Sequence, residues 1–203
     1  EIDVASCSFL HSHVLDGKAV VPMAMLPEWL AHGALHGNPG LKFYGCDNLR
    51  LLKGLVLEAD SGLRLTIHAG DAHKDEEGTY RVPVELRARQ DDGREFLHAR
   101  ADILLAESLP AGEARLSPPQ GSAYEKTAAE TYRDHLFHGP ALQGIERVQV
   151  CSPEGVTADA SAAPPPSDWM ARPFRRRWLT DPLALDVGIQ LLTFWTGVHS
   201  AGP

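Results

Sequence analysis

Apolar residues at helical spacing mark the first predicted element, a helix over residues 23–35. Proline breaks a helix interior, so either Pro27 lies in the first turn, where its missing N–H removes no intrahelical bond, or the helix begins at Pro27. The glycines and proline of residues 37–40 end the helix. The residues that recur at helical spacing are Leu26, Trp29, Leu30 and Ala34.

Strand-like patterns dominate the stretch after this helix. Residues 63–68 and 82–89 alternate apolar and polar side chains, as half-buried antiparallel strands do. A helix followed by a run of strands is typical of an α+β fold in which a sheet wraps around the helix. Strands are predicted over residues 41–47, 50–58, 63–69, 79–89 and 95–105.

Residues 107–120 form a predicted linker, because Pro, Gly and Ser are frequent there. A helix is predicted over residues 122–136, with Ala128 and Tyr132 on one face, and a tight turn follows at 137–145. The later elements are strands over 144–151 and 154–161, a proline-rich loop at 163–167 and an apolar helix over 183–195.

The two apolar helices begin in similar ways. Thr180 or Asp181, followed by Pro182, is a typical helix start. The sequences that begin at Pro22 and at Pro182 both read Pro-x-Ala-x-x. This faint repeat fits two copies of one helix-plus-sheet unit.

Composition narrows the class of protein. The net charge of −8 over 203 residues makes nucleic acid and an anionic membrane surface unexpected partners. The chain has no apolar run of about 18 residues and no signal-peptide pattern, so we expect a cytoplasmic protein that does not enter a membrane. Its three widely spaced cysteines favour free thiols. Because the chain begins with Glu1, we interpret it as a segment excised from a longer protein.

Three separated motifs carry the candidate chemistry. The first spans residues 13–22 and has the pattern H-x3-G-x4-P. The second is the turn His138-Gly-Pro-Ala-Leu-Gln-Gly144, and the third is Asp186-Val-Gly-Ile-Gln190. In order and spacing they resemble the motifs of the double hotdog dehydratase domains of polyketide and polyunsaturated-fatty-acid synthases.

The resemblance implies a double hotdog, in which two central helices are each wrapped by an antiparallel sheet. The first unit would comprise residues 1–106 and the second residues 121–203, joined by the linker at 107–120. The second unit of the family continues for several strands after its Asp-bearing helix, so here it is apparently incomplete. The family usually has tyrosine where this chain has His138, so an imidazole replaces a hydroxyl group.

The resemblance also points to an acid–base pair. Removal of water from a β-hydroxyacyl thioester needs a base for the α-proton and an acid for the departing hydroxyl group. We expect His13 to be the base and Asp186 the acid. The dipole at a helix start favours ionised Asp186, whereas burial raises the pKa of a carboxyl group and opposes ionisation. Gln190 is a candidate for orienting Asp186, because it lies four residues further along the same helix face.

Other motif residues are candidates for substrate binding or support of the site. Backbone N–H groups from Gly17 to Met23 are candidates to bind the thioester carbonyl. An ordinary loop glycine is the alternative for Gly17, and a purely structural turn is the alternative for the second motif. The support candidates are Gly17, Pro22, His138, Gly139, Gln143 and Gln190.

Two histidine pairs raise the question of a metal site. His11 and His13 are two residues apart, and His135 and His138 are three apart. Alternate residues of a strand share a face and can reach one metal ion. No cysteine or carboxylate stands nearby at a ligand-like spacing, so we predict no metal site.

The sequence therefore predicts a dehydratase domain of a multidomain polyketide or fatty-acid synthase, a hydro-lyase without a cofactor of its own. Its substrate would arrive on the phosphopantetheine of an acyl carrier protein. Arg172 and residues 175–177 are candidates for a carrier-binding surface, and a solvated basic run is the alternative. Further partners would be neighbouring synthase domains and a second copy, paired through the parent synthase. The alternative functions are a product-template-like cyclase or aromatase and a non-catalytic structural or docking module.

Overall fold

The computed structural model describes residues 1–57, 62–89, 93–112 and 117–200. In the first half of the chain the elements are the 3₁₀ helix η1 (Ser8–Ser12), β1 (Val14–Leu15), β2 (Lys18–Val20), α1 (Met25–Gly37), β3 (Lys42–Leu51), β4 (Val56–Leu57), β5 (Arg64–Ala69), β6 (His73–Lys74), β7 (Tyr80–Arg89) and β8 (Glu95–Ala106). In the second half they are α2 (Ala128–His135), the 3₁₀ helix η2 (Pro140–Leu142), β9 (Ile145–Ser152), β10 (Gly155–Ala160), α3 (Pro166–Trp169) and α4 (Pro182–Ser200).

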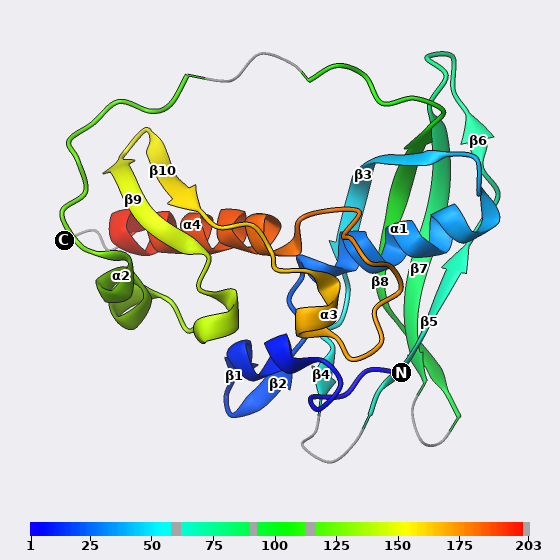
Figure 1. The fold of residues 1–203 in the computed structure, drawn as a ribbon, viewed down its shortest axis with the longest axis horizontal. Helices are drawn as coiled ribbons and strands as arrows, with labels where there is room; N and C mark the ends of the chain where they lie inside the picture. Colours follow the sequence, from blue (N-terminus) through cyan, green and yellow to red (C-terminus); the bar gives the residue numbers. More distant parts are fainter. Residues whose placement is uncertain (58–61, 90–92, 113–116, 201–203) are drawn as a thin grey trace.

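A five-stranded antiparallel sheet carries the first long helix. Its strands follow the order β3-β8-β7-β5, and β6 pairs with β7. Helix α1 packs against β3, β5, β7 and β8 (Figure 1). Alternation along β7 places Val82, Val84 and Leu86 in the core, and β8 adds Ile103 and Leu105. The apolar area buried between this helix and the sheet is the main stabilising contribution in the first half.

A smaller assembly surrounds α4. Strands β9 and β10 pair antiparallel, and β10 packs against α4, with α2 on the same side of the molecule (Figure 1). The carboxylate of Asp181 accepts the N–H of Ala184 at 2.9 Å, so Asp181 caps the start of α4. The same oxygen accepts the N–H of Ala163 at 3.0 Å, which fixes the preceding loop against this cap.

One buried carboxylate ties the start of α1 to the start of α4. The oxygens of Glu28 accept the backbone N–H groups of Leu179 and Thr180 at distances of 2.8 to 3.1 Å. His32 Nε2 lies 3.0 Å from Glu28 Oε1. Burial raises the pKa of Glu28, but these hydrogen bonds outweigh it and hold the pKa below its ordinary value. The two long helices therefore begin beside each other (Figure 1).

The N-terminal segment is docked onto the second half of the chain. Cys7 and Met170 form an isolated antiparallel bridge, and the N–H of Ala171 donates to the carbonyl of Ser6 at 2.8 Å. Helix η1 contacts η2 and α3. Strands β1, β2 and β4 form a small separate sheet just beyond this junction. The segment that carries His13 therefore lies against the turn at 138–144.

Most predicted elements are present, with shifted ends. Helix α1 begins two residues later than predicted, and Pro27 lies in its first turn as expected. The antiparallel α+β layout is confirmed. In the predicted linker, residues 107–112 and 117–120 form no helix or strand, and residues 113–116 lie outside the described part. No helix among the described residues combines the length and apolarity needed to span a bilayer.

Three predictions of local structure were wrong in extent. The strand predicted at 50–58 is reduced to β4, and residue 58 lies outside the described part. Residues 50 and 51 belong instead to β3, which continues to Leu51 through a bulge where Asn48 has a φ of 53°. The helix predicted at 122–136 is only α2, because a capping box formed by Thr127 and Glu130 starts it late. The predicted loop at 163–167 runs directly into α3.

Substitution of Glu28 tests the link between the two helices. We expect Glu28→Ala to lower the free energy of unfolding by about 2–4 kcal/mol, because each buried donor left without an acceptor costs about 1–3 kcal/mol. Glu28→Gln retains one acceptor oxygen and should lose less. Urea denaturation measures both variants.

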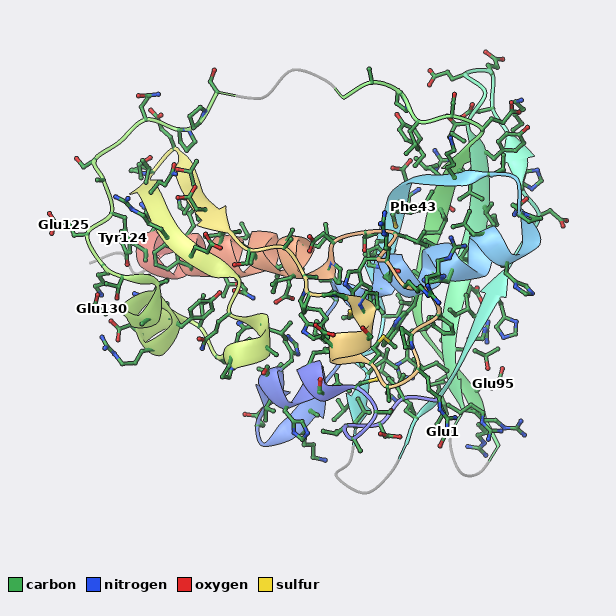
Figure 2. The ribbon with its side chains drawn as sticks, viewed as in Figure 1. Glu1, Phe43, Glu95, Tyr124, Glu125 and Glu130 are labelled. Carbon is green, nitrogen blue, oxygen red and sulfur yellow. The ribbon has the colours of Figure 1, made fainter. Side chains whose placement is uncertain are left out.

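The matched control is Glu125→Ala, at an exposed position on the other side of the molecule (Figure 2). We expect this variant to stay within about 0.5 kcal/mol of the parent chain. A similar loss in the Glu125 and Glu28 variants would contradict a specific role for Glu28.

Candidate active site

His13 directly follows η1, and one of its ring nitrogens forms a hydrogen bond while the other keeps its lone pair. Its Nδ1 lies 2.8 Å from the carbonyl oxygen of Val20. A carbonyl oxygen only accepts, so Nδ1 carries the hydrogen and donates it, which leaves the lone pair on Nε2. The N–H of Val20 donates back to the carbonyl of His13 at 2.9 Å. The hairpin of β1 and β2 thus fixes both the position of His13 and its tautomer.

Asp186 enters the site from the second turn of α4. The residue is 3% exposed, and its Oδ2 accepts a hydrogen bond of 2.7 Å from Gln190 Nε2. The spacing of four residues places the two side chains one turn apart on the same helix face. This contact fixes the orientation of the carboxyl group.

A buried network holds Gln190 in turn. Its Nε2 also donates to the carbonyl of Leu142 at 2.8 Å, and its Oε1 accepts the hydroxyl of Tyr132 at 2.7 Å. The carbonyl of Leu142 cannot donate, so the amide orientation of Gln190 follows from its partners. The hydroxyl of Tyr132 accepts the N–H of Ile145 at 2.8 Å. Burial raises the pKa of Tyr132 to about 12, so the phenol stays protonated and able to donate.

His138 completes a compact cluster. Its Nε2 lies 3.5 Å from Asp186 Oδ2, and its ring centroid lies 5.4 Å from that of His13. Potential ligand atoms of His13, His138 and Asp186 all lie within 4.8 Å of one another, and all three residues are buried. Phe137 stacks on His138 at a centroid distance of 4.1 Å. Nδ1 of His138 is buried and has no hydrogen-bond partner among the described residues.

The turn of residues 138–144 requires two of its glycines. A Cβ on Gly139 would lie 2.9 Å from the Cα of Ser12, and one on Gly144 would lie 2.7 Å from a methyl group of Val187. Ser12 accepts the N–H of Gly139 through its carbonyl at 2.8 Å and the N–H of Ala141 through its hydroxyl at 3.0 Å. Close approach on both sides lets this turn join η1 to α4.

Burial dominates the electrostatics of the cluster. It lowers the pKa of His13, although the hydrogen bond to Val20 and the nearby Asp186 act in the opposite direction. Burial, together with the nearby His13, lowers the pKa of His138 to about 4. Burial raises the pKa of Asp186 against the hydrogen bond from Gln190 and the attraction of His13. Both imidazoles are therefore uncharged at neutral pH, and Asp186 holds its proton more tightly than an ordinary aspartate.

Four of the predicted site residues lie together in the structure, and the other four do not belong to this group. His13, His138, Asp186 and Gln190 meet in the cluster. The other support candidates have separate positions. Gln143 is exposed and donates to the carbonyl of His138 at 2.9 Å, and Gly139 contacts Ser12. Pro22 lies three residues before α1, and Gly17 lies in the exposed hairpin turn with a φ of 78°.

Neither predicted histidine pair supplies two members of the cluster. His11 and His135 are exposed, whereas His13 and His138 are buried. The cluster forms instead by long-range contact between one member of each pair and Asp186. The prediction of no metal site rested on sequence neighbours and did not consider this combination.

Sequence reasoning missed two residues that position the cluster. The helical pattern places Tyr132 only on one face with Ala128, and no motif includes Ser12. A buried tyrosine usually finds a partner for its hydroxyl group, so Tyr132 carried a signal that could have been used. Ser12 carried none, because its partners at 139 and 141 are distant in the chain.

An apolar cavity of about 550 Å³ lies on another side of α4. Leu185 lines it, and successive helical residues point about 100° apart, so Asp186 faces away from it. Phe43, which Figure 2 labels near the middle of the molecule, lines the wall formed by β3. We therefore do not assign this cavity to the reacting centre.

The cluster has the parts needed for paired proton transfer. His13 presents an unprotonated ring nitrogen, and Asp186 is a buried carboxyl group whose pKa is raised. They approach from different halves of the chain, so a small substrate held between them can meet a base and an acid together. A pair of titratable groups whose surroundings shift their pKa values is typical of an active site.

Comparisons with solved structures identify the fold of this chain. The dehydratase domain of the CurK module of curacin polyketide synthase matches with a TM-score of 0.72 and 16% identity, over 99% of this chain and 70% of that structure. The dehydratase domain of PpsC from Mycobacterium tuberculosis matches with a TM-score of 0.66 and 22% identity, over 98% and 69% respectively. The chain therefore has the fold of polyketide synthase dehydratase domains.

A sequence comparison adds a similarity to one curated synthase protein. The chain is 26% identical over 196 residues to a polyunsaturated fatty acid synthase polypeptide of Thraustochytrium sp.. The match covers 96% of this chain and 7% of that protein. No protein-family model matches the chain. The resemblance to hotdog dehydratases of polyketide and polyunsaturated fatty acid synthases, expected from three motifs, is confirmed.

Tyr132→Phe tests the network behind Asp186. The substitution leaves the N–H of Ile145 and the Oε1 of Gln190 without their buried partner. We expect the free energy of unfolding to fall by about 1–3 kcal/mol, measured by urea denaturation. Tyr44→Phe, at an exposed position, is the control and should change little. Equal stability of the Tyr132 variant and the parent would show that the network contributes nothing.

Proposed function

We propose that this chain is a dehydratase domain of a multidomain polyketide or fatty-acid synthase. The reaction is loss of water from a β-hydroxyacyl thioester carried by an acyl carrier protein, which gives an enoyl thioester. The observation that carries the proposal is that a ring nitrogen of His13 and a carboxyl oxygen of Asp186 lie within 4.8 Å of each other, both buried. The likeness in fold to dehydratase domains supports it.

The proposed chemistry uses one proton transfer at each residue. Nε2 of His13 removes the α-proton, and the electron pair left behind forms the new double bond. The β-carbon–oxygen bond breaks, and the departing hydroxyl group takes the proton of Asp186 and leaves as water. Gln190 orients the carboxyl group through its hydrogen bond to Oδ2, and Oδ1 then faces the leaving group. Proton return from His13 to Asp186 through solvent resets the pair.

The start of α1 is the proposed binding place for the thioester carbonyl. The amides of Val20 and Val21 already donate to the carbonyls of His13 and Leu55. Those of Met23 and Ala24 lie in the turn that directly precedes α1, where the helix dipole favours developing negative charge. We assign the carbonyl to these two amides, at the end of the predicted stretch from Gly17 to Met23.

We propose that the two halves are two hotdog units, residues 1–106 and 121–203, joined by the linker at 107–120. Helix α1 with its large sheet and α4 with β9 and β10 support this division. The second helix has fewer strands against it in this chain, and its Leu185, Ile189 and Leu192 are exposed. The second unit is thus the smaller one here.

The proposed partner is an acyl carrier protein whose phosphopantetheine brings the substrate, so the domain needs no cofactor of its own. Arg172 and residues 175–177 are exposed in the segment between α3 and α4, close to the start of both long helices. Their positive charge fits an acidic carrier. Neighbouring synthase domains, a homodimer formed through the parent synthase and a cytoplasmic location complete this proposal.

Substitution of the acid–base pair tests the function. We expect His13→Ala and Asp186→Asn each to lower kcat for a carrier-bound 3-hydroxyacyl substrate by about 10²–10⁴-fold, because each removes one positioned proton transfer. Mass spectrometry of the acyl group follows the loss of water. His11→Ala, an exposed histidine two residues earlier, is the control and should retain activity.

Each other outcome of this assay decides against the proposal. Near-normal turnover in either variant excludes that residue as acid or base. A folded parent chain that dehydrates no such substrate would favour a non-catalytic module. Formation of an aromatic ring in place of the enoyl product would favour a cyclase.

Gln190→Met makes a prediction about pH. The hydrogen bond from Gln190 lowers the pKa of Asp186, so its loss raises that pKa further. Asp186 must hold its proton to act, and kcat/KM therefore falls as pH rises through this pKa. We expect the alkaline limb of the pH profile to move to higher pH, while the acid limb, set by His13, stays in place. Movement of the alkaline limb to lower pH would contradict this assignment.

A further inference from the structure

The cluster of His13, His138 and Asp186 has a donor set that the proposed dehydration does not fully use. Dehydration needs one base and one acid, and the second imidazole has no assigned proton transfer. Two imidazoles and one carboxylate are ligands that borderline divalent transition metals prefer. His13 directly follows η1, His138 lies in the turn before η2, and Asp186 lies in α4, so the three residues converge from different segments on one buried point.

We propose that these three side chains form a site that binds Zn²⁺ or a similar divalent transition metal ion reversibly. Tetrahedral ligands of Zn²⁺ lie about 2.0–2.2 Å from the metal and therefore roughly 3.3 Å from one another. The candidate ligand atoms lie within 4.8 Å of one another. Small rotations of the two imidazoles would close this difference, and a water molecule or a thiol would take the fourth position.

The surroundings of two ligands have the pattern found around protein metal sites. A ligating histidine usually donates its other ring N–H to a carbonyl or carboxylate, and ligating carboxylates are themselves hydrogen-bonded. His13 donates Nδ1–H to the carbonyl of Val20, which leaves the lone pair on Nε2 for a metal ion. Asp186 is held by Gln190, and Gln190 is held by Tyr132.

His138 is the residue that turns an acid–base pair into a three-ligand site. It is more than nine-tenths buried, and its Nδ1 has no hydrogen-bond partner among the described residues. Its Nε2 lies 3.5 Å from Asp186 Oδ2, too far for a strong hydrogen bond. Neither ring nitrogen of His138 therefore has to give up a strong hydrogen bond when it ligates a metal ion.

The metal site has a consequence that rests on the proposed function. A bound metal ion would occupy the lone pair of His13 and replace the proton of Asp186, which are the two groups that dehydration needs. Zn²⁺ should therefore inhibit the reaction, and a chelator should restore it. Binding itself is measured without substrate, so the metal site and the dehydratase function can fail separately.

Co²⁺ titration of the metal-free chain tests the site directly. Co²⁺ held by histidine and carboxylate ligands in a low-coordinate site absorbs visible light, and Zn²⁺ displaces it. We expect saturable binding of one equivalent. Gln190→Met should weaken it by about 10–100-fold, the usual effect of removing a partner of a ligand, and His138→Phe should weaken it more.

The matched control is His135→Phe, because His135 is exposed and lies only three residues from His138. The chain has 10 histidines, so surface binding is the competing explanation. We expect the His135 variant to bind Co²⁺ like the parent chain. If His138→Phe does not fold by circular dichroism, His13→Asn takes its place, since it removes a different ligand.

Three results would overturn the proposal. The first is the absence of saturable Co²⁺ binding by the folded parent chain. The second is equal binding by the parent chain and the folded His138 or His13 variant. The third is equal loss of binding in the His135 and His138 variants. Retained Co²⁺ binding in a chain without dehydratase activity would support the metal site and contradict the proposed function.

Discussion

The candidate site depends on the contact between Ser12 and the turn at 138–144. The carbonyl and hydroxyl oxygens of Ser12 accept two backbone N–H groups of that turn, and a side chain at Gly139 would prevent the approach. His13 follows Ser12 directly, so its place opposite Asp186 is set by main-chain geometry. Two hydrogen bonds of Ser12 thus help to bring together His13 and Asp186, which are far apart in the sequence.

Asp186 shows how two opposing effects are decided by magnitude. A helix start stabilises a negative charge by about 0.3–1 kcal/mol, and by up to about 2 kcal/mol in favourable cases. Desolvation moves a buried pKa by up to about 3–5 units, at roughly 1.4 kcal/mol per unit. Asp186 is almost fully buried and one turn inside the helix, so burial prevails and its pKa is raised. Gln190 limits that rise and sets the orientation.

The sequence predicted those features that local patterns encode. Helical spacing located α1 and α4, alternation located β5 and β7, and motif spacing singled out His13, His138, Asp186 and Gln190. The Thr127–Glu130 capping box was equally readable and would have corrected the start of α2. The structural role of Glu28 was not predictable, because its carboxylate accepts hydrogen bonds from amides near residue 180 that no local pattern connects to it. The same holds for Ser12 and for the meeting of His138 with His13.

The imidazole at 138 changes what the cluster can do. A tyrosine hydroxyl there would donate one hydrogen bond and remain neutral. The ring of His138 instead stacks on Phe137 and brings a second neutral imidazole close to the acid. Burial keeps both imidazoles uncharged, which is the state that a proton acceptor and a metal ligand both require. Burial therefore keeps His13 in the uncharged form that a base requires, and it keeps both imidazoles in the form that binds a metal cation.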